Sequence, residues 1–137
     1  MSAADKPVPV PNEDNAPYWE GARQRRLVLP RCTACGQYYA RPRIVCAVCH
    51  GEQFAWTPVS GRGVIHSYTV VHQTTSPGFQ DELPYVIVHV TIAEQPECVV
   101  TANLIGVFDA DRLTIDLPVV VDFEDRGDQT LPQFRLA

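Results

Sequence analysis

Four cysteines in two closely spaced pairs are the residues of this chain best suited to chemistry. Each pair has the spacing Cys-x-x-Cys, which brings two thiolates together on one tight turn. Ten residues separate the pairs, so both turns can face a common centre. Four thiolates in that arrangement match the tetrahedral coordination of zinc. We therefore predict a Zn²⁺ site whose ligands are Cys32, Cys35, Cys46 and Cys49.

Glycines next to both pairs favour the same interpretation. Gly36 directly follows the first pair, and Gly51 follows the second pair after His50. A chain that curls around a metal needs residues with positive φ, which glycine adopts at little cost. We expect Gly36 and Gly51 to adopt such angles. We also expect residues 36–45 to connect the pairs in a rubredoxin-like ribbon of two short hairpins.

Disulfide bonds are the alternative use of such cysteines, and the expected compartment argues against them. No apolar stretch follows Met1, so the sequence shows neither a secretory signal nor a membrane span. We therefore expect a cytoplasmic protein, in which a reducing environment keeps thiols free for metal binding. The fifth cysteine, Cys98, lies in an apolar run and is expected to be a small core residue.

The elements that must position these thiols are short. The 137 residues include 12 prolines and 8 glycines between short β-branched runs, which favours strands and turns over long helices. Asp14 and Asn15 can cap a helix and Pro17 is tolerated in its first turn, so we predict a helix from Ala16 to about Arg26. Residues 27–30 are predicted to form a strand that leads into the first cysteine pair.

Downstream of Trp56 the hydrophobic pattern changes to a period of two, which is typical of strands with one buried face. In residues 84–94, for example, Val86, Val88, Val90 and Ile92 fall on one face. The predicted strands are residues 61–73, 84–94, 97–105, 119–124 and 131–135. Five short antiparallel strands favour a small barrel of the OB-fold type. The predicted fold class is mainly β: a short N-terminal helix and a rubredoxin-like zinc ribbon, followed by a five-stranded OB-fold barrel.

We divide the chain into three parts. Residues 1–13 are rich in proline and charge and are expected to form a flexible, extended arm. Residues 14–56 are assigned to the N-terminal helix and zinc ribbon, and residues 57–137 to the OB-fold domain. The small metal module does not need a large core, because metal binding contributes to its folding energy.

The net charge of −5 is unevenly distributed along the chain. Residues 23–62 carry a net charge of +6, whereas residues 63–137 carry −8. An acidic chain with a single lysine is a poor general binder of nucleic acid, because affinity for a polyanion grows with the number of phosphates neutralised. The basic ribbon still suits a small phosphorylated ligand or an acidic partner surface.

Four residues are candidates for ligand binding. Arg41 and Arg43 alternate with aromatic residues in the ribbon, where they could stack on a nucleotide or could belong to a surface that docks on the neighbouring module. Tyr68 lies on a predicted strand face together with histidines. Phe79 lies at the centre of the turn-rich loop 74–83, which is the segment we expect to move or to touch a ligand.

No catalytic residue is predicted. His66, His72 and His89 lie on predicted strands, and none has a serine, cysteine or carboxylate at a spacing that forces a triad or dyad. We interpret these histidines as structural. The chain also lacks a glycine-rich phosphate loop and a metal-hydrolase motif, so we do not expect it to be an enzyme on its own.

A series of short motifs runs through both modules, from about residue 15 to the C-terminus. The motifs are Pro17-Tyr18-Trp19-Glu20, Leu29-Pro30-Arg31-Cys32 with Cys35-Gly36, Cys46 with Cys49, Gly61-Arg62-Gly63 with Ser67-Tyr68-Thr69-Val70-Val71, Leu83-Pro84-Tyr85-Val86, Thr101-Ala102-Asn103-Leu104, Leu117-Pro118-Val119 with Phe123-Glu124-Asp125, and Leu131-Pro132-Gln133-Phe134-Arg135. In this order and spacing, the chain resembles a family of two-module bacterial and archaeal proteins with a zinc ribbon and an OB-fold, long catalogued as a domain of unknown function.

This resemblance implies a service role in acyl-coenzyme A metabolism. By this resemblance, the chain is expected to act as family members do, as a small partner of a larger enzyme. The partners of the family are thiolase-superfamily enzymes (thiolases, acyltransferases and the retro-aldolases of steroid side-chain breakdown) and hot-dog-fold hydratases. It implies a non-catalytic subunit of a hetero-oligomer that stabilises a thiolase-fold partner and helps to admit acyl-CoA, as in sterol side-chain or aromatic acyl-CoA degradation. The alternatives are a free-standing acyl-CoA binding protein and a zinc-ribbon/OB-fold module that binds nucleic acid.

Two positions depart from the family pattern, and both lie in predicted loops. The turn between the second and third barrel strands usually carries a glycine, and here it reads Glu94-Gln95-Pro96-Glu97. Asp116 stands where family members commonly have glycine. Both changes concern local turn geometry, and we expect the fold to be unaffected.

Overall fold

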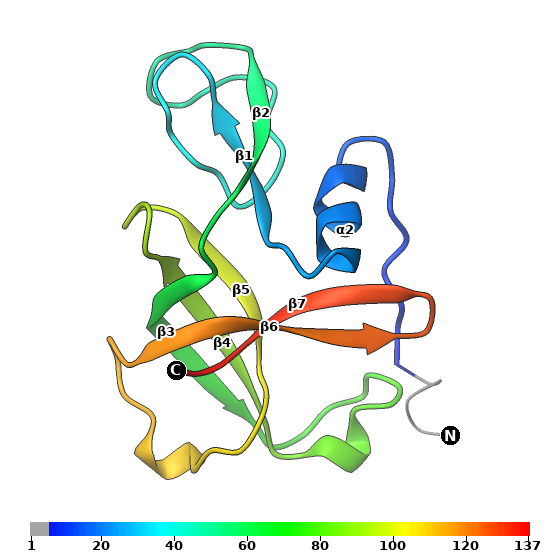
Figure 1. Ribbon diagram of the computed structural model, residues 1–137. Helices are drawn as coiled ribbons and strands as arrows, with labels where there is room; N and C mark the ends of the chain where they lie inside the picture. Colours follow the sequence, from blue (N-terminus) through cyan, green and yellow to red (C-terminus); the bar gives the residue numbers. More distant parts are fainter. Residues whose placement is uncertain (1–5) are drawn as a thin grey trace.

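A computed structural model describes residues 6–137, in which the strands form a small ribbon beside a closed barrel (Figure 1). The ribbon sheet consists of β1 (Val28–Cys32) and β2 (Phe54–Pro58). The barrel strands are β3 (Arg62–Val71), β4 (Tyr85–Ile92), β5 (Val99–Leu104), β6 (Pro118–Arg126) and β7 (Gln129–Leu136). Two short 3-10 helices, Gln80–Glu82 and Ala110–Arg112, lie in the loops. The predicted mainly β fold, with its helix, ribbon and five-stranded barrel, is confirmed.

The barrel closes in the order β3-β4-β5-β7-β6, and each predicted strand is present with ends within two residues of those expected. Neighbouring strands are antiparallel except β5 and β7, which run parallel where Leu104 pairs with Phe134. Along β4 the side chains alternate as the sequence pattern predicts: Val86, Val88 and Val90 are buried. These apolar faces form the core of the barrel.

Helix α2 (Ala16–Arg23) ends three residues before the predicted end. Arg25 adopts a φ of 59°, which lies in the left-handed region and stops the helical hydrogen-bond pattern. Asn15 is the N-cap residue, but its side chain forms no capping bond and instead accepts a hydrogen bond from the Asn12 backbone N–H at 2.8 Å. No helix within residues 6–137 is long and apolar enough to cross a lipid bilayer.

Strand β2 was missing from the sequence-based prediction. It pairs antiparallel with β1, from Cys32 opposite Phe54 to Val28 opposite Pro58. None of its five residues is fully buried, so it lacks the period-two hydrophobic pattern that marks the barrel strands. Its last two residues continue the pairing beyond residue 56, where the sequence-based division placed the end of the ribbon.

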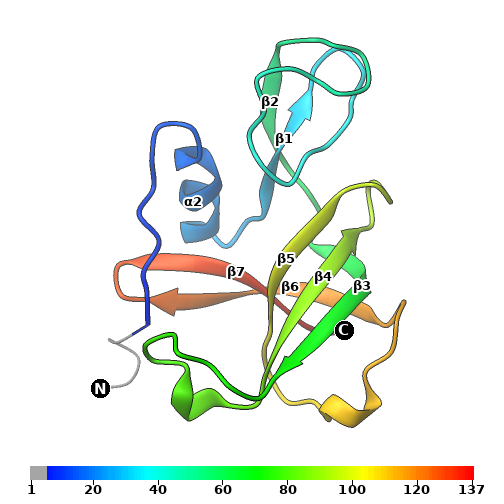
Figure 2. The ribbon, with the colours of Figure 1, turned by 180° about the vertical axis from the view of Figure 1, so that it is seen from behind.

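The ribbon and the barrel share one hydrophobic core. Leu27 and Leu29, at the start of the ribbon, belong to the same buried cluster as Phe134 of the barrel. Helix α2 packs against both β1 and β7 (Figure 2). A buried polar contact adds to this link: the Gln95 side chain accepts a hydrogen bond from the Tyr38 N–H at 2.7 Å and donates one to the Tyr38 carbonyl at 2.9 Å. The unusual turn that carries Gln95 therefore joins the two modules.

Aspartate at position 116, the second departure from the family pattern, is held in a strained backbone conformation. Asp116 has a φ of 69°, in the left-handed region that glycine adopts without strain. Its backbone N–H donates to the Ile65 carbonyl at 2.8 Å, which fixes the loop before β6. This geometry explains why glycine suits the position, and the fold tolerates aspartate there.

Candidate metal centre and groove

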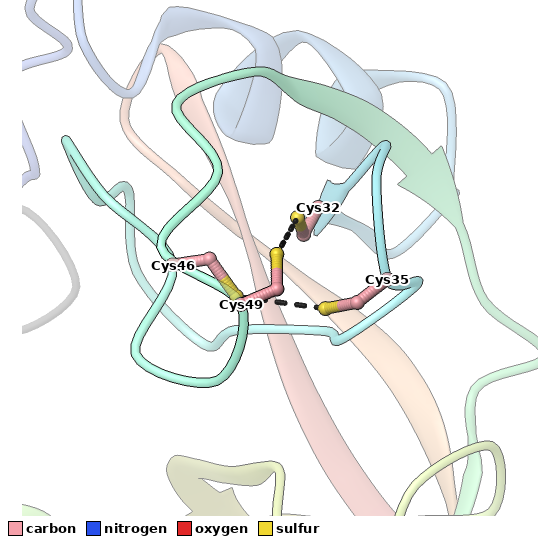
Figure 3. Close-up of side chains that lie close together, drawn as sticks. All are labelled: Cys32, Cys35, Cys46 and Cys49. Atoms are coloured by element: carbon pink, nitrogen blue, oxygen red, sulfur yellow. Dashed lines mark hydrogen bonds between the residues drawn. The ribbon is translucent and has the colours of Figure 1, made fainter.

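The four predicted zinc ligands meet at one end of the ribbon (Figure 3). The Sγ atoms of Cys32 and Cys49 are 3.5 Å apart, and those of Cys35 and Cys46 are 3.6 Å apart. All four sulfurs lie within 4.8 Å of one another. Sulfurs placed tetrahedrally at about 2.3 Å from a zinc ion would be roughly 3.8 Å apart. The four-cysteine cluster thus has the donor atoms and spacing that zinc requires.

The two cysteine turns have the same backbone geometry. In the first, the Gly36 N–H donates to the Cys32 carbonyl at 2.9 Å, and in the second the His50 N–H donates to the Cys46 carbonyl at 2.9 Å. The positive φ falls on these equivalent positions, with 83° at Gly36 and 64° at His50. The expectation was therefore right for Gly36 and wrong for Gly51.

Gly51 leaves room beside the cysteine sulfurs. A Cβ atom there would lie 3.2 Å from the Cys49 sulfur and 3.5 Å from the Cys32 sulfur. Its backbone N–H also points toward the Cys49 sulfur at 3.4 Å. A side chain at this position would crowd the metal site from within the ribbon.

The cysteine cluster is half covered by protein. Cys32 and Cys46 are buried, whereas Cys35 and Cys49 are exposed. The Tyr39 hydroxyl lies 3.2 Å from the Cys46 sulfur, and this hydrogen bond, together with smaller effects of the Cys49 and Val48 backbone, lowers the pKa of the Cys46 thiol to about 6. A lowered pKa favours the thiolate, which is the form that binds metal.

Cys98 is separate from this cluster. It is 3% exposed and belongs to the core shared by ribbon and barrel, as the sequence predicts. Burial, with a smaller effect of Glu94, raises the pKa of the Cys98 thiol to about 11. Its environment favours the neutral thiol, in contrast to that of Cys46.

A groove with a volume of about 610 Å³ lies where helix, ribbon and barrel meet. Aromatic side chains of α2 and β2, including Trp19 and Trp56, line it together with His89 of β4. Arg41 also lines this groove. The remaining lining residues are Asn15, Tyr18, Ala40, Pro42, Val99, Val100 and Thr101. The groove thus combines apolar aromatic walls with one guanidinium group.

The other three candidate ligand-binding residues lie away from this groove. Arg43 lies over the ring of Tyr39, 4.8 Å from its centroid. Tyr68 is part-buried and its hydroxyl donates to the Leu113 carbonyl at 2.9 Å. These two side chains therefore take part in contacts within the protein, and their ligand binding stays a prediction.

Phe79 is held between charged side chains. Its ring lies 5.0 Å from Lys6 Nζ and 5.5 Å from the Arg126 guanidinium. Lys6 forms a salt bridge with Glu82, and Arg126 donates to the Pro7 carbonyl at 3.1 Å. Residues 6 and 7 of the predicted arm thus pack against loop 74–83 and β6, and they hold this loop on the barrel.

Sequence reasoning did not group the aromatic residues that line this groove. His89 is interpreted from the sequence as structural, and neither Trp19 nor Trp56 is among the candidates for ligand binding. The three residues come from α2, β2 and β4, so no local spacing could have grouped them. The single available signal was the presence of two tryptophans in or next to the ribbon.

Both modules match known protein families. Residues 19–55 match the model described as the rubredoxin-like zinc ribbon domain of ChsH2, and residues 56–124 match the C-terminal OB-fold domain of ChsH2. Among solved structures, a chain of the Ltp2-ChsH2(DUF35) aldolase superposes with a TM-score of 0.81 at 35% sequence identity. This match covers 94% of this chain and 98% of that chain.

Two curated proteins are also similar. A probable enoyl-CoA hydratase alpha subunit from Thermomonospora curvata is 38% identical over 133 residues, which are 96% of this chain and 40% of that protein. A DUF35 domain-containing scaffold protein from Methanocaldococcus jannaschii is 32% identical over 78 residues, which are 56% of this chain and 55% of that protein. The chain thus spans between 40% and 55% of the length of these two relatives.

Proposed function

This chain belongs to the ChsH2 family of DUF35 proteins, and we propose that it is a non-catalytic accessory subunit of a thiolase-superfamily enzyme that acts on C–C bonds of acyl-CoA. The observation that carries the proposal is the likeness to the Ltp2-ChsH2(DUF35) aldolase, which extends over 94% of this chain. The relatives named as a hydratase subunit and as a scaffold protein support a role within a larger assembly.

In this proposal the four cysteines hold Zn²⁺ as a structural centre. The donor set fits, because four sulfurs lie within 4.8 Å of one another on two equivalent turns. A closed set of four thiolates leaves no position open for water or substrate, so the metal stabilises the ribbon and takes no part in bond cleavage. The catalytic groups then belong to the larger partner.

Exposed apolar side chains on the ribbon support binding to a protein partner. Ile44 is 89% exposed and Val48 is 62% exposed, and both lie beside the metal cluster. Neither Arg41 nor Arg43 forms an ion pair with any residue in the range 6–137. An apolar surface bordered by such arginines suits a partly apolar, acidic protein surface.

The groove supports a role in admitting acyl-CoA. Trp19 and Trp56 offer apolar walls for an acyl or pantetheine group, and the guanidinium of Arg41 can pair with a phosphate. Arg43 stacks on Tyr39 and does not line this groove, so its ligand binding stays a prediction. Sterol side chains and aromatic acyl groups both suit a groove of this character.

Affinity purification of the tagged chain from its native host tests the proposal. We expect a thiolase-fold subunit to co-elute in a fixed ratio through a subsequent gel-filtration step. Mass spectrometry of the complex identifies the partner, and through it the reaction. Elution of the chain alone, or with nucleic acid, would contradict the accessory role.

A free-standing acyl-CoA binding protein is the second candidate, favoured by the groove and by Arg41. Calorimetric titration of the isolated chain with acetyl-CoA separates the two functions. Binding that Arg41→Ala abolishes, and that the control Arg112→Ala in the barrel leaves intact, would support a carrier. Absence of binding by the isolated chain removes this second candidate and leaves the accessory role.

A further inference from the structure

The contact between Tyr39 and Cys46 joins the metal cluster to a side chain outside it. The Tyr39 hydroxyl oxygen lies 3.2 Å from the Cys46 sulfur, and the Ala47 N–H donates to the same oxygen at 2.9 Å. A backbone N–H can only donate, so the hydroxyl oxygen is the acceptor in that bond. Its own hydrogen is then free to point at the sulfur.

The direction of the second hydrogen bond follows from metal binding. A metal-bound cysteine is a thiolate, which has no hydrogen to donate and can only accept. The Tyr39 hydroxyl must therefore donate to Cys46. The hydroxyl then donates one hydrogen bond to Cys46 and accepts one from the Ala47 N–H.

The ring that carries this hydroxyl is held on two sides. The guanidinium of Arg43 lies 4.8 Å from the centroid of Tyr39, and the ring of Phe54 packs against it edge-on at 5.9 Å. Arg43 also donates to the Val45 carbonyl at 3.1 Å, next to the metal-binding cysteine. These contacts hold the ring with its hydroxyl at Cys46, and the cation above the ring strengthens the phenol as a donor.

We infer that Tyr39 is a positioning residue for the metal, in that its hydroxyl orients the Cys46 thiolate and slows release of the bound ion. The inference rests on the zinc site of the proposed function. A zinc ion with four thiolates concentrates negative charge on sulfur, and a donated hydrogen bond offsets part of that charge on Cys46. Outer partners of this kind typically change metal affinity about 10- to 100-fold.

Replacement of Tyr39 by phenylalanine isolates the hydroxyl, because the ring and its contacts with Arg43 and Phe54 remain. We expect Tyr39→Phe to weaken zinc affinity about 10-fold or more in competition with a chromogenic chelator, with faster zinc release. The matched control is Tyr38→Phe. Tyr38 is the neighbouring tyrosine, and its ring lies under a guanidinium in the same way, with Arg31 at 4.7 Å. This control should release zinc at the same rate as the wild-type protein.

Cobalt spectroscopy distinguishes an effect on the thiolate from a general loosening of the ribbon. In the Co²⁺-substituted protein, loss of the hydrogen bond should move the sulfur-to-cobalt charge-transfer band of Tyr39→Phe to longer wavelength. Tyr38→Phe should keep the band of the unchanged protein. Equal affinity and an unshifted band in Tyr39→Phe would overturn the inference, as would weaker affinity with an unshifted band.

The same measurements keep this inference distinct from the zinc assignment. If the unchanged protein binds neither Zn²⁺ nor Co²⁺, the metal site of the proposed function fails and the role of Tyr39 fails with it. If the unchanged protein binds both ions and Tyr39→Phe behaves identically, only the role of Tyr39 fails.

Discussion

In the ribbon, residues 33–58 bury just two side chains, Tyr38 and Cys46. In the barrel, by contrast, every strand contributes buried residues to a continuous core that includes Ile65, Val88 and Phe134. The ribbon even leaves Ile44 89% exposed. Hydrophobic burial can therefore stabilise the barrel, but it is scarce in residues 33–58 of the ribbon.

The difference indicates what each region depends on. A loop-rich segment with so little buried apolar surface cannot offset its loss of conformational entropy without another source of stability. We propose that a metal ion held by the four cysteines supplies that source in the ribbon. The two regions also differ in charge, since residues 23–62 carry +6 and residues 63–137 carry −8. On this proposal the basic ribbon depends on a metal for its stability, whereas the acidic barrel depends on its core.

Loss of a zinc ligand should have the largest effect, and it should be confined to the ribbon. Structural zinc contributes about 10 to 16 kcal/mol in small zinc peptides, and Cys32→Ser forfeits much of this energy. We expect the bound zinc, measured by atomic absorption, to fall from one ion per chain to none. The control Cys98→Ala, which changes the cysteine of the core, should retain the ion. Full zinc content in Cys32→Ser would contradict the ligand assignment.

Truncation of a side chain in the barrel core should destabilise the barrel and leave the bound zinc in place. Phe134 is 1% exposed, and replacement of a buried phenylalanine by alanine costs about 3 to 5 kcal/mol. Denaturant unfolding followed by circular dichroism should show this loss for Phe134→Ala, while the folded fraction keeps its zinc. Val107→Ala, at a fully exposed position of the barrel, should leave stability unchanged. Zinc loss in folded Phe134→Ala would show that the two regions are not stabilised separately.

The contact between the regions should have an intermediate effect. Gln95→Ala removes both hydrogen bonds to the Tyr38 backbone and leaves buried polar groups without partners, which costs about 1 to 3 kcal/mol. Hydrogen exchange of the Tyr38 amide should become faster, by a factor that corresponds to this loss of free energy. Gln80→Ala, at an exposed loop position, provides the matched control. An unchanged Tyr38 exchange rate would indicate that Gln95 does not couple the ribbon to the barrel.

A glycine at position 116 should have the smallest effect and should stabilise the barrel. Asp116 holds a φ of 69°, and relief of a left-handed conformation is worth about 1 kcal/mol. Thermal unfolding of Asp116→Gly should therefore show a higher Tm. The control Asp128→Gly changes an aspartate whose φ is not positive, and this variant should not have a higher Tm. A lower Tm for Asp116→Gly would argue that the side chain contributes a contact that outweighs the strain.

The four-cysteine cluster and the barrel strands could be predicted from the sequence for different physical reasons. The cysteine pairs act over a few residues, so their spacing alone predicts the cluster. The barrel strands follow from alternation, because a period of two places Val86, Val88 and Val90 on one side. Each signal is local in the sequence and does not depend on how distant segments of the chain pack.

Features that depend on several distant segments could not be predicted. Strand β2 has no buried periodicity and exists because β1 offers it a partner. The Gln95 contact spans 57 residues of sequence. Even within the ribbon, the positive φ falls on His50 because the second turn copies the first, and residue type alone favours Gly51. The hydrogen bond of Tyr39 to Cys46 likewise requires the folded ribbon.

Hydrogen exchange after zinc removal tests most directly whether metal and core act separately. The wild-type chain is treated with a chelator, and exchange is measured at the two cysteine turns and at β4. We predict that the amides of Gly36 and His50 lose protection while those of Val86 and Val90 keep it. Equal loss of protection in β4, or full protection of Gly36 and His50 in zinc-free protein, would contradict the account.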